Sequence, residues 1–469
     1  MYKLHTLIGL ASLALASCSF TPEYQRPAAP VAAQFPGTSG GTGAPASDRG
    51  WREVFGDPRL DALIELALHN NRDLRVAVLN VELAAAEHRI QRAGLLPSVA
   101  GTAGTSWFGT KDGTVPGATP RYQAGVSMSY ELDLFGRVRS LTTQALEQYL
   151  ATAEARRATH LTLVASVASQ YLAERALSEQ LTLARQTLAS VEASSLVTQR
   201  QFEAGRRSEL DATTAAGQIE TARAEVARLS RLWAQAQNAL VLLVGQPLPD
   251  ALPPAQPLDQ QGIVADLPAG VPSELLARRP DILAAEHALL AANANIGAAR
   301  AAFFPQISLT AFAGLASNAL SNLFTAGAFS WTAGSTATVP IFSGGSNIAN
   351  LDAAKVRKQI QVAQYEKAIQ TAFREVADGL VARGYFVDQL TAQTARVAAE
   401  QRRFTISETR YASGLESYVA VLLAQQDLYA AQQQLVDVRL ASLTSAVDVY
   451  RALGGGWLER SAPATVSAR

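Results

Sequence analysis

The sequence predicts an α+β membrane protein that is built from two structural repeats and assembles as a homotrimer. Three copies are expected to form a β-barrel of twelve strands, four from each chain, that continues into a long α-helical barrel. Three observations lead to this fold class. Motifs recur along the 469-residue chain at an offset of about 208 residues. Each half contains strand-like segments with one apolar face, and each half ends in about 100 residues without proline.

The N-terminus has the features of a bacterial lipoprotein leader. Lys3 precedes an apolar run, Leu7–Leu15, that is too short to cross a bilayer as a helix. The run leads into Leu15-Ala16-Ser17-Cys18, which resembles a lipobox and contains the only cysteine of the chain. We therefore expect a signal peptide at 1–17 and a covalent lipid on Cys18. Residues 18–50, rich in Pro, Gly, Ala, Ser and Thr, are expected to be an extended tether. The alternative is an ordinary free cysteine behind a conventional cleavage site.

Two repeats follow the tether, at residues 51–246 and 273–457. A Pro-rich connector at 247–272 separates them, and a tail at 458–469 follows. The matching motifs are Asp73-Leu74 with Asp281-Ile282, Leu95-Leu96-Pro97 with Phe303-Phe304-Pro305, Phe135-Gly136 with Phe342-Ser343, and Phe202 and Gly205 with Tyr411 and Gly414. The nearly constant offset indicates two copies of one structural unit.

Each repeat begins with a helix, expected at Asp57–Gly94 and at Pro280–Ala302, which a proline then ends. A β-hairpin follows, with its Gly-rich loop at Gly109–Pro120 or Ala316–Ala328. The apolar faces of three strand-like segments are Tyr122, Ala124, Val126, Met128, Tyr130 and Leu132; Ile307, Leu309, Ala311, Ala313 and Leu315; and Phe329, Trp331, Ala333, Ala337 and Val339. Strands of this length favour a membrane barrel over a soluble sandwich, whose strands are shorter.

Two long helices are expected to complete each repeat, within Arg139–Val244 and Ser346–Leu453, and to meet near Gly205 or Gly414. The first helix of each pair would have about 60 residues and a length of about 90 Å. The second helix of each pair carries two sets of residues spaced seven apart, one mostly bulky and one mostly small. Such seams let helices approach closely and supercoil. In the first repeat these sets are Ile219, Val226, Trp233 and Leu240, and Ala215, Ala222, Leu229, Ala236 and Leu243.

Strands in lipid must form a closed sheet, because an open edge leaves backbone groups without hydrogen bonds. Two hairpins supply only four strands, whereas the smallest barrels need about eight. The strands of several copies must therefore be pooled, and three copies give twelve. A barrel that continues into a hollow tube of helices is a conduit for solutes, with no chemistry of its own.

Composition and motifs exclude several other functions. The 40 basic and 40 acidic residues cancel, whereas nucleic-acid-binding proteins carry a basic excess. One cysteine excludes an intramolecular disulfide and a zinc site of the Cys type. The histidines of the mature chain are isolated and form no metal-binding motif. We therefore expect no enzyme, no metal, no bound nucleic acid and no cofactor besides the lipid on Cys18.

Short motifs along the mature chain are Cys18 with Pro22-Glu23-Tyr24 and Pro27; Leu132-Asp133-Leu134-Phe135-Gly136; Arg278-Arg279-Pro280-Asp281-Ile282; Phe303-Phe304-Pro305-Gln306-Ile307; Pro340-Ile341-Phe342-Ser343-Gly344-Gly345; and Leu453-Gly454-Gly455-Gly456-Trp457. They resemble TolC-family outer membrane factors, in particular the lipoprotein OprM/NodT-like group. The resemblance implies a trimeric barrel, an α-helical periplasmic tunnel, and an inner-membrane pump bridged by a periplasmic adaptor (a membrane fusion protein). The Gly-Gly-Gly-Trp ending resembles members that work with resistance-nodulation-division (RND) pumps, which implies export of drugs or other toxic small molecules.

The expected location is the bacterial outer membrane, with the lipid-anchored chain in contact with membrane lipid and extending into the periplasm. Ser19 supports this location, since an aspartate there would resemble an inner-membrane retention signal. A conduit for type I protein secretion stays open as an alternative, because it shares the architecture. A trimeric stalk or adhesin would not require duplicated hairpins.

The periplasmic gate is expected at the two helix junctions after Gly205 and Gly414. The resemblance implies acidic residues beyond the second junction that select cations, at positions that here hold Ala420 and Leu423. A ring of leucines would instead close by apolar contact and dewetting. Asp427, one helical turn beyond Leu423, is a further candidate for charge.

The resemblance also implies links between the junctions in the closed state. Asp211 and Tyr411 are candidates for such links, and Arg206 or Arg207 is the expected partner of Glu416. The alternative for all of these residues is a solvated loop or an exposed helix end, where charges contribute little.

Overall fold

The structure is a computed structural model that describes residues 19–35, 46–108, 119–264 and 276–461. Cys18 and the expected signal peptide lie outside the described residues, as do parts of the tether, the first hairpin loop, the connector and the tail. The chain forms two compact units. Unit 1 contains residues 1–29, 79–154 and 283–367, and unit 2 contains 30–78, 155–282 and 368–469.

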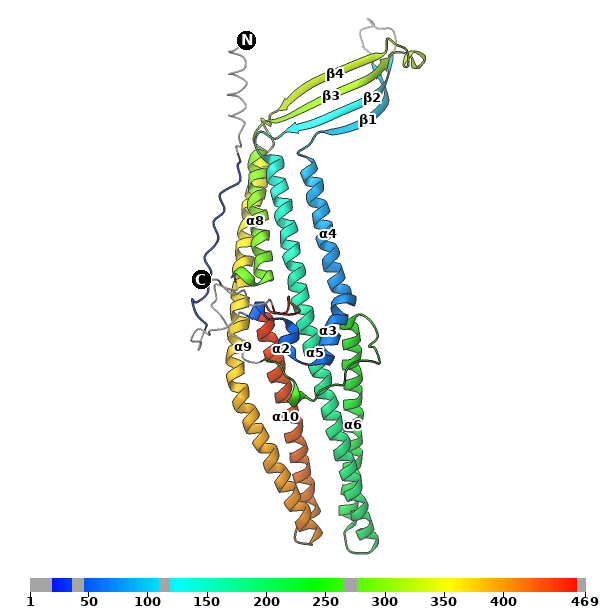
Figure 1. Cartoon of the computed structure of the whole chain (residues 1–469), viewed down its shortest axis with the longest axis vertical. Coiled ribbons are helices and arrows are strands. Elements are labelled where there is room, and N and C mark those ends of the chain that lie inside the picture. Colours follow the sequence, from blue (N-terminus) through cyan, green and yellow to red (C-terminus); the bar gives the residue numbers. More distant parts are fainter. Residues whose placement is uncertain (1–18, 36–45, 109–118, 265–275, 462–469) are drawn as a thin grey trace. The chain divides into compact units, whose positions relative to one another are not determined.

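Figure 1 shows the helices and strands in their chain order. The α-helices are α2 (Trp51–Phe55), α3 (Pro58–Asn70), α4 (Arg72–Ala93), α5 (Arg137–Glu203), α6 (Glu209–Val244), α8 (Pro280–Ala301), α9 (Ser346–Ala412) and α10 (Tyr418–Ala452). Short 3₁₀ turns occur at Ala46–Asp48, Leu258–Gln260 and Leu320–Asn322. The strands are β1 (Ser98–Phe108), β2 (Thr119–Leu132), β3 (Gln306–Ser317) and β4 (Phe329–Thr338).

Unit 1 contains a four-stranded antiparallel sheet in the order β1-β2-β3-β4. Each repeat supplies one hairpin, and β2 pairs with β3 across the two repeats. The register places predicted apolar residues opposite one another: Val126 faces Ala313, which faces Trp331. The predicted alternation is therefore confirmed, because the apolar sets of the strands lie on one face of the sheet.

Phe312 is a large apolar residue on the other face. It stands between Ala311 and Ala313 in β3, so its side chain points away from theirs. Gly125 and Gly314 are register partners, and a Cβ on either would come within 3 Å of the Phe312 ring and of the partner backbone. The two glycines thus make room for the ring of Phe312 on this mostly polar face.

The first helix of the first repeat is not continuous, so the prediction of one helix over Asp57–Gly94 is wrong. The chain forms α3 and α4, separated at Asn71, whose backbone is extended at φ −62° and ψ 131°. The Asn71 side chain accepts a hydrogen bond from the amide of Leu74 over 2.9 Å and donates one to the carbonyl of Leu243 over 2.8 Å. A side chain that caps one helix and binds the end of another favours a break over a continuous helix. The predicted helix at Pro280–Ala302 is confirmed as α8, within one residue.

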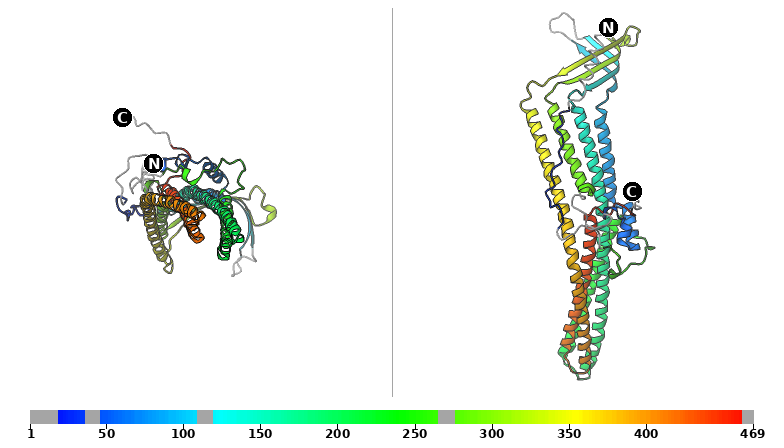
Figure 2. Two further views of the ribbon diagram at one scale, coloured as in Figure 1. Left: turned by 90° about the horizontal axis from the view of Figure 1, so that it is seen from below. Right: turned by 60° about the vertical axis from the view of Figure 1, so that its left-hand side comes forward.

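The long helices are confirmed. Helices α5 and α9 each contain 67 residues, and each is followed by a second long helix after a short turn. Both views in Figure 2 show α5 beside α6 and α9 beside α10. The heptad seam of α6 is buried at Ala215, Leu229, Ala236 and Leu240. Among the described residues, no helix is both long enough and apolar enough to span a bilayer.

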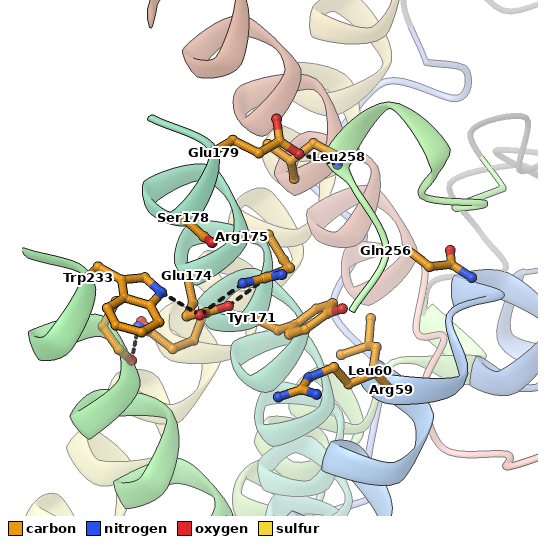
Figure 3. A network of polar contacts seen from close by, with 12 residues as sticks. Arg59, Leu60, Tyr171, Glu174, Arg175, Ser178, Glu179, Trp233, Gln256 and Leu258 are labelled. Carbon is orange, nitrogen blue, oxygen red and sulfur yellow. Dashed lines mark hydrogen bonds and ion pairs between the residues drawn. The ribbon is translucent and has the colours of Figure 1, made fainter. Parts of the chain in front are cut away.

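A polar network within unit 2 joins α5 to α6 and to the connector (Figure 3). Glu174 is only 6% exposed and accepts hydrogen bonds from the indole of Trp233 over 2.7 Å and from Arg175 over 2.8 Å. Glu179 accepts one from the amide of Leu258 over 2.7 Å. A buried carboxylate is tolerated only when it is paired in this way.

Asp57 is the second buried carboxylate of this region and is 0% exposed. It caps α3 by accepting a hydrogen bond from the amide of Arg59 over 2.8 Å. Its other oxygen accepts one from the hydroxyl of Tyr171 over 2.8 Å and one from Gln261 over 2.9 Å. Burial, together with this bond, raises the pKa of Tyr171, so its hydroxyl remains a donor. Asp57 thereby holds α3, α5 and the connector together.

We expect Tyr171→Phe to lower the stability of the helical unit by about 1–3 kcal/mol, because a buried carboxylate loses one donor. The measurement is the thermal unfolding midpoint of the purified protein, followed by circular dichroism at 222 nm. Tyr385→Phe is the matched control, since Tyr385 is 72% exposed on α9. Equal midpoints for the two variants would contradict a stabilising role for the Tyr171 hydroxyl.

Candidate functional site

The two turns that join the paired long helices, residues 204–208 and 413–417, have the same backbone geometry. Each contains a glycine in the left-handed region, Gly205 at φ 70° and Gly414 at φ 75°. In both, the amide after the glycine donates to the carbonyl five residues earlier, over 2.8 Å and 2.9 Å. This is the usual way to end a helix before a tight reversal. The junctions that the sequence predicts are therefore two copies of one turn.

The second helix of each pair begins with a serine cap. Ser208 accepts a hydrogen bond from the amide of Asp211 over 3.2 Å, and Ser417 accepts one from the amide of Ala420 over 3.4 Å. Asp211 and Ala420 thus occupy the same position in α6 and α10. A carboxylate in the first turn of α6 is favoured by the helix dipole, whereas Ala420 brings no charge to α10.

Tyr411 lies where the two helical hairpins, α5/α6 and α9/α10, touch each other, and it is only 9% exposed. Its hydroxyl is 3.5 Å from that of Thr198, on α5. The guanidinium of Arg207 lies 4.4 Å from the centre of its ring, which is a cation–π contact. The ring of Tyr418, at the start of α10, lies 5.5 Å away. Tyr411 therefore joins the turn at 204–208 to the α9/α10 hairpin.

An apolar cluster supports this contact. Tyr411 and Tyr418 pack with Val421, Leu422 and Ala215. Burial raises the pKa of Tyr418, so its ring stays neutral within the cluster. Because Ala215 belongs to α6, the cluster spans both helical hairpins. The small side chain of Ala215 lets α6 and α10 approach each other closely.

Glu416, in the second turn, has a partner other than the one expected. Within the chain, Glu416 pairs with Arg410 over 2.8 Å, not with Arg206 or Arg207. Arg410 and Glu416 lie at the two ends of the turn that joins α9 to α10. The partner of Glu416 is therefore six residues away in the chain and not on the α5/α6 hairpin. Arg207 instead stacks on a tyrosine and hydrogen-bonds to Gln201 over 3.1 Å.

Asp427 also has a basic partner. Its carboxylate pairs over 2.7 Å with Arg403 of α9, which in turn pairs with Glu400 over 3.0 Å. The Asp427 side chain is half exposed, so this pair adds little stability. It does, however, place a positive charge directly beside the carboxylate.

Leu423 and Val419 form an exposed apolar pair on α10. Both are 53% exposed, and a spacing of four residues places them on the same face of the helix. The neighbouring Val421 and Leu422 are buried in the apolar cluster. The face that carries Leu423 is therefore apolar and available for contact with other chains or with solute.

Sequence reasoning missed three parts of this site: the cation–π contact of Arg207, the Thr198 hydroxyl beside Tyr411, and the Arg403 partner of Asp427. The first two join residues about 200 positions apart. The offset between the repeats signals which turns correspond, but it does not signal which side chains touch. Among the described residues, no cluster of potential metal ligands is present.

Comparisons with known proteins give a consistent result. The family model described as outer membrane efflux protein matches residues 63–246 and 271–455. The toluene efflux pump outer membrane protein TtgC of Pseudomonas putida is 47% identical over 475 residues, which cover 99% of this chain and 98% of that protein. The cation efflux system protein CusC of Escherichia coli is 42% identical over 95% of this chain and 97% of that protein. The crystal structure of the open state of the Neisseria gonorrhoeae MtrE outer membrane channel has a TM-score of 0.86 at 40% identity, with 95% and 100% coverage.

We expect Arg207→Ala to loosen the contact between the hairpins, because a cation–π contact contributes about 1 kcal/mol, or about a fivefold change in local opening. The measurement is hydrogen–deuterium exchange of amides in residues 198–211 and 404–420. Arg206→Ala removes the same charge from an exposed neighbour and is the control. If the two variants exchange at the same rate, the stacking does not hold the turn.

Proposed function

Since the chain belongs to the outer membrane efflux protein family and is an outer-membrane channel of an efflux system, we propose that it conducts toxic amphiphilic small molecules passively and closes through an apolar gate. The observation that carries this proposal is the combination within one chain of a four-stranded sheet with an apolar face and two long helical hairpins. The sheet fits a membrane, and the hairpins fit a tunnel wall. No catalytic step is needed for such a conduit.

The edges of the sheet explain why several copies associate. Strands β1 and β4 are its two edges, and in lipid their free backbone groups need partners. Pairing β4 of one copy with β1 of the next closes the sheet after three copies, with twelve strands. Each copy also adds two helical hairpins to the tunnel.

The proposed gate is the face of α10 that carries Val419 and Leu423. Three copies of this face around a narrow axis would form two apolar rings one helical turn apart. The nearby carboxylates of Glu416 and Asp427 are each paired with an arginine, which weakens their field. A narrow apolar constriction excludes water and hydrated ions without charge. The Arg207–Tyr411 contact would hold the hairpins in the closed arrangement.

The cargo and partners are proposed from the relatives. TtgC is named for toluene efflux and CusC for cation efflux. An apolar gate matches an apolar or amphiphilic cargo better than a metal cation, so we propose drugs and solvents as the exported class. An energised inner-membrane pump of the RND type and a periplasmic adaptor would supply the cargo. Lipid on Cys18 would add an anchor in the membrane.

We expect Leu423→Ala to raise the single-channel conductance of the trimer in planar bilayers, because truncation widens an apolar constriction and admits water. Leu423→Asp should in addition raise selectivity for cations over anions, since it adds an acidic group at the same place. Leu415→Ala is the control, because Leu415 is 68% exposed in the turn itself. Unchanged conductance in both Leu423 variants would exclude this residue from the gate.

Deletion of the gene tests the cargo. We expect greater susceptibility to amphiphilic drugs and organic solvents, restored by the wild-type gene, and little change in tolerance to metal cations. A defect confined to metal cations would contradict an amphiphilic cargo. Unchanged susceptibility together with loss of a secreted protein would favour a type I secretion conduit.

A further inference from the structure

The helical segments of unit 1 form a layer whose two edges match those of the sheet. Figures 1 and 2 show them side by side in the order α4, α5, α8 and α9, so α4 and α9 lie at the edges. Helix α4 leads into β1, and α9 follows β4, the two edge strands. A copy that pairs its β1 with β4 of another copy therefore brings its α4 beside the other copy's α9.

The contact between α5 and α8 is a guide to this second contact, because the repeats correspond residue by residue. Helix α9 matches α5 at an offset of 209 residues: Gly136 and Gly345 have φ values of 72° and 86°, and each directly precedes a helix of 67 residues. Helix α4 matches α8 at an offset of 208, and Pro97 and Pro305 follow them at corresponding positions. The chain thus contains one complete contact between repeats and the two halves of another.

Polar side chains make the contact between α5 and α8. Nδ1 of His287 lies 2.7 Å from Oε2 of Glu147, and the Glu147 side chain is only 17% exposed. The side-chain amide of Asn295 donates to Oε1 of Gln144 over 2.8 Å. Ser140 is buried one turn nearer the sheet. The spacing of Ser140, Gln144 and Glu147 places all three on one face of α5.

The matching face of α9 is apolar. The three polar positions of α5 are occupied there, in chain order, by Ala349, Ala353 and Val356. Val356 is 52% exposed, and Ala349 is exposed as well. These side chains offer no partner to a carboxylate or an amide, so the face gains free energy only from contact with apolar surface.

The matching face of α4 is apolar and bulkier. The position of the histidine on α8 that pairs with α5 holds Leu79, which is 50% exposed. Two buried alanines of α8, Ala291 and Ala298, correspond to the exposed Leu83 and Ile90. The spacing of Leu79, Leu83 and Ile90 places them on one face of the helix. Large side chains on α4 therefore match small ones on α9, which lets two helices approach closely.

The helix–sheet junctions repeat this relation. The rings of Phe135 and Phe304 stack 5.0 Å apart, where the chain leaves β2 and enters β3. Their counterparts are Phe342, after β4, and Leu96, before β1. Both are exposed, Phe342 at 91% and Leu96 at 69%. Each edge of unit 1 thus carries one half of an apolar contact that is complete between β2 and β3.

We propose that a second copy of this chain covers α9 with its α4, in the register of the α5/α8 contact. Leu79 of one copy then lies against Val356 of the next, and Leu96 lies against Phe342. Polar pairs join the repeats within a chain, and apolar pairs join them between chains. This difference, here called the pairing code, decides which repeat each helix accepts. The inference goes beyond the efflux function, because it concerns recognition between copies.

The pairing code disfavours both wrong arrangements. If α4 of another copy took the place of α8 on α5, Glu147 would lie against Leu79, and a buried carboxylate without a partner is costly. If α8 of another copy covered α9, His287 would lose its acceptor and face Val356. Specificity of this kind comes from the penalty on the wrong partner as much as from the fit of the right one.

Disulfide cross-linking of the full-length protein in membranes tests the register. Leu79→Cys combined with Val356→Cys should give a covalent trimer after mild oxidation, seen on non-reducing gels, whereas neither single variant should. Ile90→Cys combined with Val356→Cys is the matched control, because Ile90 lies about 16 Å from Leu79 along α4. Equal yields from the two pairs, or a bond that forms only within one chain, would overturn the proposal.

Transplanting the polar pair tests the pairing code. Val356→Glu places a carboxylate against Leu79 and should speed heat-induced dissociation of the trimer about tenfold. Adding Leu79→His recreates the pair of His287 and Glu147 at the contact between copies and should restore most of the stability, as a double-mutant cycle would show.

Gln359→Glu is the control for charge, because it adds a carboxylate at an exposed position of α9 outside the three matched residues. Dissociation of the Val356→Glu trimer no faster than that of the Gln359→Glu trimer would overturn the proposal. So would a double variant, Leu79→His with Val356→Glu, that is no more stable than Val356→Glu alone.

Discussion

Backbone hydrogen bonds at the edges of the sheet are the constraint on which the rest of the assembly depends. Strands β1 and β4 each pair on one side within the described chain, and in lipid every remaining amide and carbonyl costs several kcal/mol unless it is paired. A closed sheet in lipid therefore requires strands from more than one copy. The number of copies that closes the sheet also sets the number of helical hairpins in the tunnel.

Periodic features of the fold could be predicted from the sequence. Alternation in β2 and β3 predicted which side chains share a face, and it excludes a shift of one residue, which would turn Val126 and Ala313 to opposite sides. The register itself came only from the structure. Long stretches without proline predicted α5 and α9. The break at Asn71 could not be predicted in this way, because asparagine is tolerated inside helices and its partner, Leu243, is about 170 residues away.

The candidate site was predictable to the level of the turns and no further. Glycines at a constant offset located both junctions, since few other residues adopt a left-handed backbone there. Glu416 and Asp427 pair with Arg410 and Arg403 of α9. Several other arginines lie nearby in the sequence, so the sequence alone does not show which of them forms each pair. Side-chain choice among such near-equivalent partners is decided by tertiary packing, which a single sequence does not encode locally.

The two turns share one backbone but not one set of side chains. Asp211 in the first hairpin occupies the position of Ala420 in the second, below equivalent serine caps. A trimer would therefore present six turns of two kinds: three are followed by an aspartate at the third position of the next helix, and three by an alanine. The end of the tunnel that these turns form would therefore have threefold symmetry in its side chains, although the six turns share one backbone geometry. A partner with six identical binding elements would meet two different environments, and a partner with three could use either set.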